Sequence, residues 1–163
     1  MNQWLKKDKH MKYNISGVGE IEINTIVMDL NGTLAIRGKV IKGVKEKLSK
    51  LKGKGFKLIL VSSDQRDNAE QIAKELEIEF YAAKTLEEKA EFMQSLNPEN
   101  ITAIGNAQVD IGLFSNAKLS IATLQAEGIH AEIIKHVDII VPSIIDALNL
   151  LLDEDTVAST MKI

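Results

Sequence analysis

The chain has no cysteine, which excludes a disulfide-stabilised scaffold and a metal site built on thiolates. This absence fits a reducing compartment. No apolar run is long enough to span a bilayer, and the amino terminus lacks the hydrophobic core of a signal peptide. We therefore expect a cytoplasmic protein that has no membrane partner.

The chain also has little net charge. Its 20 Lys and Arg residues against 23 Asp and Glu residues give a formal net charge of −3. A charge this small gives no electrostatic support for binding nucleic acid or a membrane surface, so no nucleic-acid partner is expected. With 163 residues, of which 45% are hydrophobic and 26% charged, the composition is that of a soluble globular protein with a full core.

Neither an internal repeat nor an interdomain linker divides the sequence. Residues 1–12 are predicted to be an N-terminal extension whose composition allows partial disorder, and residues 13–163 are predicted to form a single domain. Residues 20–23 read Glu-Ile-Glu-Ile, an alternation typical of a strand. With Gly17 or Gly19 at the turn, this pattern predicts a β-hairpin ahead of the main sheet.

Apolar runs and helical spacings alternate along the rest of the chain. Strands are predicted at residues 25–29, 56–61, 78–81, 101–104, 119–122 and 139–141, and helices at 44–53, 66–76, 86–96, 110–117 and 144–152. This alternation predicts an α/β fold, a three-layer α/β/α Rossmann-like parallel sheet. Residues 35–40 are enough for a compact flap, so no large cap domain is expected.

Polar residues follow three of the predicted strands, at 29–33, 62–64 and 105–110. The carboxyl ends of parallel strands meet at one edge of a sheet, so these groups can share a crevice. Lys89 lies near the start of the helix that precedes the third of these strands. An aspartate, small hydroxyls, a lysine and a second carboxylate suit phosphoryl transfer to a carboxylate, with a hard metal ion bridging the negative groups.

The order and spacing of these groups resemble the haloacid dehalogenase superfamily of aspartyl-phosphate enzymes, and in particular small soluble proteins related to the phosphorylation domain of P-type ATPases. The resemblance runs from about Thr25 to the carboxyl terminus. Residues 29–34 (Asp-Leu-Asn-Gly-Thr-Leu) resemble the first motif of the superfamily. The later motifs are matched by residues 61–64 (Val-Ser-Ser-Asp), 88–89 (Glu-Lys), 104–110 (Ile-Gly-Asn-Ala-Gln-Val-Asp) and the tail at 137–148.

This resemblance implies a Mg²⁺-dependent phosphohydrolase that forms a covalent aspartyl-phosphate on Asp29 and acts on phosphate esters or acyl phosphates. The implied catalytic residues are Asp29, Asn31 and Lys89; the implied phosphate-binding residues are Gly32, Thr33, Ser62, Ser63 and Lys89; the implied metal site comprises Asp29, Asn31 through its backbone carbonyl, Asn106 and Asp110. The substrate would be a phosphorylated small molecule or macromolecule. Cap-less members generally take macromolecular substrates or close the site with a neighbouring subunit, which implies a homo-oligomer.

Four positions depart from the pattern of the superfamily: Asn31, Asn106, Ala107 and Val109. The first two bear directly on the chemistry. Phosphatases usually carry a second Asp two residues after the nucleophile, and here Asn31 cannot exchange a proton near neutral pH. P-type ATPases have Thr at that position and still form a phosphoenzyme, so Asn31 predicts slow turnover. Asn106 replaces an expected metal-binding Asp, and its amide oxygen brings no charge to a cation.

Alternatives remain at this level. The same crevice would serve a catalytically inactive descendant that binds phosphate, a nucleotide or a protein, and a response-regulator receiver is a weaker rival. Lys84 competes with Lys89 for the site. Asp64 is favoured as the N-cap of the following helix, and Asp110 has a similar capping interpretation.

Overall fold

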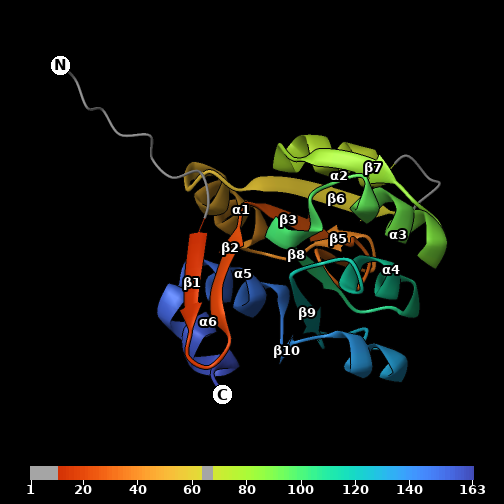
Figure 1. The fold of residues 1–163 in the computed structure, drawn as a ribbon. Helices are drawn as coiled ribbons and strands as arrows, with labels where there is room; N and C mark the ends of the chain where they lie inside the picture. Colours follow the sequence, from red (N-terminus) through yellow and green to blue (C-terminus); the bar gives the residue numbers. More distant parts are fainter. Residues whose placement is uncertain (1–10, 64–67) are drawn as a thin grey trace.

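A six-stranded parallel sheet forms the centre of the molecule in the computed structural model, which describes residues 11–63 and 68–163 (Figure 1). The strand order is β10-β9-β8-β3-β6-β7. The strands are β3 (Thr25–Met28), β6 (Lys57–Ser62), β7 (Glu79–Ala82), β8 (Ile101–Gly105), β9 (Leu119–Thr123) and β10 (Ile139–Val141). Because β3 pairs with β6 on one side and β8 on the other, its carboxyl end lies in the middle of the sheet edge.

Helices cover both faces of the sheet, so the predicted three-layer α/β/α architecture is confirmed. Helices α1 (Val44–Gly53), α2 (Asn68–Leu76) and α5 (Ile144–Leu152) pack in the core on one face, with Ile26 and Met28 of β3. On the other face α3 (Leu86–Gln94) and α4 (Ile111–Phe114) pack in a second core with Val27. Successive residues of β3 thus point to opposite cores, as a strand buried on both faces requires.

The predicted N-terminal hairpin is present as β1 (Met11–Ile15) and β2 (Gly19–Ile23), which pair antiparallel. Its first strand begins two residues before the expected domain boundary at Tyr13, while residues 1–10 of the predicted extension lie outside the described residues. The hairpin packs against α5 and α6 (Glu154–Met161), the latter a helix that the sequence reasoning did not predict (Figure 1). The buried Tyr13 hydroxyl donates to the carbonyl of Leu151 at 2.7 Å.

The flap after β3 is a two-stranded ribbon of β4 (Ala35–Ile36) and β5 (Lys39–Val40). Neither here nor between β6 and β7 do the described residues contain an inserted domain, which agrees with the expected lack of a large cap. Three short 3₁₀ helices complete the described chain: η1 (Pro98–Asn100), η2 (Gln108–Asp110) and η3 (Ala131–His136). Among the described helices, none has the length and apolar character needed to cross a bilayer.

Some boundaries differ from those predicted. The helix expected at 110–117 is divided into η2 and the four-residue α4, and the turn after it ends at β9. The helix expected to start near residue 66 is described from Asn68 onward. Asp64, interpreted as its N-cap, lies outside the described residues.

Candidate active site

Asp29 directly follows β3 at the centre of the sheet edge. Its backbone N–H donates to the carbonyl of Ile104 at 3.1 Å, which continues the pairing with β8 and fixes the start of the loop. The chain then turns sharply: Thr33 N–H donates to the carbonyl of Leu30, and Gly32 has φ +77°. Residues other than glycine adopt that φ at a cost, so Gly32 permits the change of direction that the sequence indicated.

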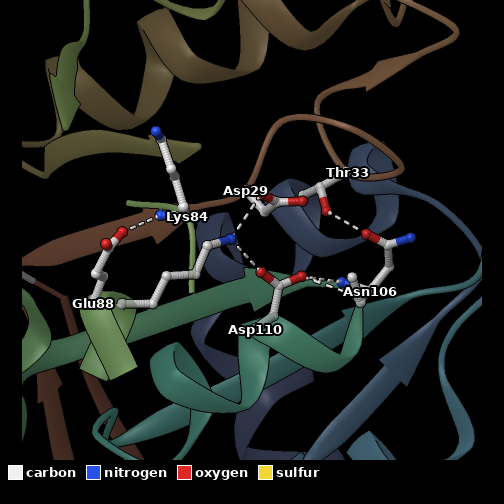
Figure 2. A network of polar contacts seen from close by, with 8 residues as sticks. Asp29, Thr33, Lys84, Glu88, Asn106 and Asp110 are labelled. Atoms are coloured by element: carbon white, nitrogen blue, oxygen red, sulfur yellow. Dashed lines mark hydrogen bonds and ion pairs between the residues drawn. The ribbon is translucent and has the colours of Figure 1, made fainter. Parts of the chain in front are cut away.

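Lys89 reaches Asp29 from α3. Thr85 caps this helix by accepting a hydrogen bond from Glu88 N–H at 3.1 Å, and Lys89 follows one residue later. The Lys89 ammonium lies 3.0 Å from Oδ1 of Asp29 and 2.7 Å from Oδ1 of Asp110 (Figure 2). Its side chain is only 1% exposed. The side chain of Lys84 extends away from both carboxylates, so the structure brings Lys89 into the site and leaves its rival outside (Figure 2).

Asp110 connects Lys89 to the loop after β8. One carboxylate oxygen contacts the ammonium, and the other accepts hydrogen bonds from the backbone N–H groups of Asn106 and Ala107, each at 2.9 Å. A methyl group on Gly105 would lie 2.5 Å from that second oxygen, so glycine is needed for the carboxylate to reach its donors. Asp110 is fully buried, and its carboxylate both stabilises the loop after β8 and forms an ion pair with Lys89.

The electrostatics of this cluster favour an additional cation. Burial raises the pKa of Asp29 to about 7, and repulsion from Asp110 adds to the increase, whereas Lys89 opposes it. Burial on its own lowers the pKa of Lys89, but attraction to both carboxylates raises it above the ordinary value. Two carboxylates therefore share one ammonium in a buried place, leaving a net negative charge when all three are ionised.

Thr33 and Asn106 face one another beside Asp29. The Thr33 hydroxyl lies 3.5 Å from Oδ1 of Asn106, whose amide nitrogen donates to the carbonyl of Gly128 at 3.0 Å (Figure 2). With the nitrogen held there, the oxygen of the amide is the atom turned toward Thr33. Gly32 packs against this amide so closely that a Cβ would overlap it.

The remaining predicted residues lie around this centre. Ser62 is the last residue of β6 and is buried at the sheet edge next to β3. Ser63 follows it and is exposed, and Asn31 is exposed in the turn after Asp29. The structure thus places Lys89 in direct contact with both Asp29 and Asp110 and sets Thr33 against Asn106. Ser62 lies at the end of the neighbouring strand β6, and Asn31 and Ser63 lie in the flanking loops.

The potential metal ligands at this site are oxygen atoms, which suit a hard cation, but they carry little negative charge. Within residues 11–63 and 68–163, no group of three His, Cys, Asp or Glu side chains has a geometry that would hold a metal ion. The oxygens near the loop are the Asp29 carboxylate, the Asn106 amide oxygen and the backbone carbonyls. Oxygen donors of this type suit Mg²⁺, although they offer less negative charge than a set of three carboxylates.

Sequence reasoning missed two residues that hold the loop, Thr123 and Gln125. Both donate side-chain hydrogen bonds to the carbonyl of Gly32, at 3.2 and 2.9 Å. They lie at and just after the end of β9, a fourth strand ending at the same sheet edge. The sequence could have indicated them, because Thr123 and Gln125 are polar residues that follow a predicted strand, the same pattern that was used at three other strands.

A model of haloacid dehalogenase-like hydrolases matches residues 2–118, most of the chain, including the segments of Asp29, Lys89 and Asp110.

Two protein relatives share part of the sequence. An uncharacterised protein of Methanocaldococcus jannaschii is 38% identical over 78 residues, which are 45% of this chain and 84% of that protein. The copper-exporting P-type ATPase B of Archaeoglobus fulgidus is 29% identical over 109 residues, 61% of this chain. The chain spans only 16% of the length of that ATPase.

Solved structures share the fold at low sequence identity. The 3-deoxy-D-manno-octulosonate 8-phosphate phosphatase of Moraxella catarrhalis, in complex with magnesium, phosphate and KDO, has a TM-score of 0.69 at 16% identity, covering 84% of this chain and 90% of that one. The cobalt-bound deoxy-D-mannose-octulosonate 8-phosphate phosphatase of Haemophilus influenzae has a TM-score of 0.67 at 15% identity, covering 84% and 91%. At these identities the likeness establishes a common fold.

Proposed function

The chain belongs to the haloacid dehalogenase-like hydrolases, and we propose that it is a slow phosphohydrolase that forms an aspartyl-phosphate on Asp29. One observation carries the proposal: Lys89 bridges Asp29 and Asp110 at the carboxyl edge of the sheet, where two strands from distant parts of the sequence end. A carboxylate fixed on a strand, with a buried ammonium beside it, is arranged as a nucleophile next to a group that stabilises phosphoryl oxygens.

The first step uses the Asp29 carboxylate as the nucleophile. One of its oxygens forms a bond to phosphorus, the bond from phosphorus to the leaving group breaks, and the leaving oxygen keeps the electron pair. Lys89, the Thr33 hydroxyl and Ser62 would stabilise the phosphoryl oxygens as charge moves onto them. In the second step water attacks phosphorus, the bond between phosphorus and the Asp29 oxygen breaks, and the carboxylate keeps the electron pair. The proton lost by the water passes to the phosphate or to solvent, and inorganic phosphate leaves.

Asn31 limits both steps. Its amide has no proton to give to a leaving group and cannot take one from water near neutral pH. Leaving groups that depart as stable anions, such as the carboxylate of an acyl phosphate or an aryl oxide, need no such proton. We therefore expect acyl phosphates and aryl phosphates to be better substrates than alkyl phosphate esters, and the aspartyl-phosphate to hydrolyse slowly.

Mg²⁺ is the proposed cofactor. The Asp29 carboxylate, the backbone carbonyl of Asn31 and the amide oxygen of Asn106 would hold it, with Asp110 nearby as the second acidic residue. When bound, the ion would neutralise charge on the phosphoryl group and the nucleophile. A phosphorylated substrate would itself supply negative charge that the protein donor set lacks, so metal and substrate are expected to bind cooperatively.

Incubation with acetyl phosphate or p-nitrophenyl phosphate and Mg²⁺ tests this proposal, with the natural chain compared to Asn31→Asp. The expected result is an acid-stable, hydroxylamine-sensitive adduct on Asp29 that is released slowly, and faster release in the variant. If both proteins fold and bind phosphate but neither forms an adduct nor turns over, the chain is instead a binding module for phosphate, a nucleotide or a protein. Asn31 and Asn106 are the residues that favour this second function.

Closure of the site by a second copy of the chain is part of the same proposal. The flap of β4 and β5 is short, and Asn31 and Ser63, which follow the ends of the adjacent strands β3 and β6, are exposed. A homo-oligomer would exclude water from the phosphoryl group as a cap domain does. The molar mass measured by light scattering, with and without phosphate and Mg²⁺, tests this part separately.

A further inference from the structure

The loop that follows β9 is attached to the site at several points that the proposed chemistry does not use. The Gln125 side-chain amide donates to the carbonyls of Gly32 at 2.9 Å and Thr33 at 2.8 Å. Further along the same loop, Gly128 accepts from the amide of Asn106. Residues from the end of β9 thus hold both loops that carry site groups.

Gln125 is itself held firmly. Its side-chain oxygen accepts a hydrogen bond at 3.1 Å from the N–H of Ile144, the first residue of α5, and its own N–H donates to the carbonyl of Pro142. Its backbone has φ +26°, a conformation that residues other than glycine rarely adopt. The backbone of Gln125 is strained, and both the nitrogen and the oxygen of its side-chain amide form hydrogen bonds. The surrounding structure therefore fixes this residue.

The Gly32 peptide is held from both directions. Its N–H donates to the carbonyl of Ala35 at 2.8 Å, while its carbonyl accepts from Gln125 and from Thr123. Glycine has more backbone freedom than any other residue, so these hydrogen bonds restrain the loop at its most flexible residue. The peptide lies between Asn31 and Thr33, both residues of the proposed site.

We propose that Gln125 is a positioning residue, whose side-chain amide holds the Gly32–Thr33 backbone in the one conformation that the site needs. It acts through the loop and touches no reacting atom. Its effect on turnover rests on the proposed function, whereas its effect on the loop does not. The order of the loop can therefore be measured independently of phosphatase activity.

The sequence supplies such a readout, because residues 31–32 are an Asn-Gly pair. In deamidation the Gly32 backbone nitrogen attacks the side-chain carbonyl carbon of Asn31, a cyclic imide forms and ammonia leaves; water then opens the imide to aspartate or isoaspartate. In the structure that N–H is committed to Ala35, so the reaction requires the loop to open. The deamidation rate of Asn31 therefore reports how often the loop opens.

Two variants separate the donor role of Gln125 from its other contacts. Gln125→Glu keeps an acceptor for the Ile144 N–H but cannot donate to the two carbonyls when ionised. Gln125→Met removes the amide without adding a charge. The exposed Gln94 provides a matched control, Gln94→Glu, on α3.

Deamidation is followed by mass spectrometry of the tryptic peptide that spans residues 13–37, in which Asn14 and Asn24 serve as internal references. Both Gln125 variants are expected to speed deamidation at Asn31 about tenfold, the effect of losing two hydrogen bonds to the loop, and Gln94→Glu to leave it unchanged. The two Gln125 variants should also lower kcat/KM for p-nitrophenyl phosphate by about ten- to a hundredfold, and the rate should depend less strongly on Mg²⁺ concentration.

The outcomes are distinct. Unchanged deamidation at Asn31 in variants that unfold at the wild-type urea concentration overturns the inference, even if turnover falls. Faster deamidation in both variants, with no turnover in any protein including the natural chain, supports the role of Gln125 and contradicts the proposed enzymatic function instead. Faster deamidation accompanied by unchanged turnover in an active wild-type background also overturns the inference, because the loop order would then not matter to the site.

Discussion

The ammonium of Lys89 lies 2.7 Å from the carboxylate of Asp110, and both side chains are buried. Asp110 in turn holds two backbone N–H groups of the β8 loop, so the position of the lysine is tied to the conformation of that loop. The same ammonium contacts Asp29, the proposed nucleophile. One lysine therefore connects the ends of two neighbouring strands. Its loss should lower the free energy of unfolding as well as the catalytic rate.

Replacement of Lys89 by Met should destabilise the fold strongly. It leaves Asp29 and Asp110 buried without their shared cation, and removing one partner of a buried ion pair costs about 3 kcal/mol or more. The free energy of unfolding, measured with urea at pH 8, gives the size of the effect. Lys84→Met is the control, expected to change stability by less than about 0.5 kcal/mol because that side chain extends away from the site. Equal effects of the two substitutions would contradict the arrangement described here.

Replacement of Asp29 by Asn should stabilise the protein in metal-free buffer, and increasingly so as the pH rises. The pKa of Asp29 is about 7 in the folded protein, against an ordinary value near 4 in the unfolded chain. Its protonated form therefore contributes stability that is complete below about pH 4 and is lost as pH rises through 7. The variant lacks this loss, so its advantage should reach about 1–3 kcal/mol at pH 8 and shrink at pH 5.

Urea unfolding at the two pH values, in the presence of EDTA, measures this difference. Glu91→Gln, at an exposed position on α3, is the control for removal of a carboxylate from the surface. A constant stability difference between Asp29→Asn and the natural protein from pH 5 to pH 8 would show that burial does not raise the pKa of Asp29.

Replacement of Asn106 by Asp should strengthen metal binding. A charged oxygen would take the place of the amide oxygen beside Thr33, and the added attraction is expected to tighten Mg²⁺ binding at least about tenfold. Without metal the same variant should be less stable, because it loses the hydrogen bond to Gly128 and adds a third carboxylate near Asp29 and Asp110.

Calorimetric titration with Mg²⁺, together with the Mg²⁺ dependence of Tm, tests both halves of that expectation. The control is Asn149→Asp, which adds the same charge at an exposed position on α5, a helix that carries none of the proposed metal ligands. This variant should have the Mg²⁺ affinity of the natural protein. If Asn106→Asp binds Mg²⁺ no better than this control, position 106 is not part of a metal site.

Replacement of Gly112 by Ala should displace α4 from α3. A methyl group there would overlap the backbone carbonyl of Leu86, at the start of the helix that carries Lys89. The expected cost is about 1–3 kcal/mol in unfolding free energy, with a loss of phosphatase activity because Lys89 moves relative to Asp110. Gly53→Ala is the matched control: its site at the end of α1 is open, so stability should stay equal or rise by up to about 1 kcal/mol. Equal stability of the two variants would mean that α3 and α4 are less tightly packed than the structure indicates.

Much of the fold was accessible from local sequence patterns. The apolar run before Asp29 predicts a strand buried on both faces, and β3 is flanked by β6 and β8 with a core on each side. Helix α6 was missed because its sequence, Glu-Asp-Thr-Val-Ala-Ser-Thr-Met, buries only one side chain completely, Val157. Its amphipathic pattern is weak, and contacts with α5 and β1 stabilise it.

The sequence by itself determined which residues stand at strand ends, since the alternation of apolar runs and turns is a local property. It therefore placed Asp29 and Asp110 at one edge of the sheet. The resemblance to the superfamily added Lys89, with Lys84 as its rival, and marked Asn31 and Asn106 as departures from the family pattern. Only the tertiary structure decided that Lys89 rather than Lys84 enters the crevice, and that Gln125 holds the Gly32 loop. These contacts join residues 60 and 93 positions apart. Contacts so distant in sequence depend on how the strands are ordered in the sheet, and no local pattern encodes that order.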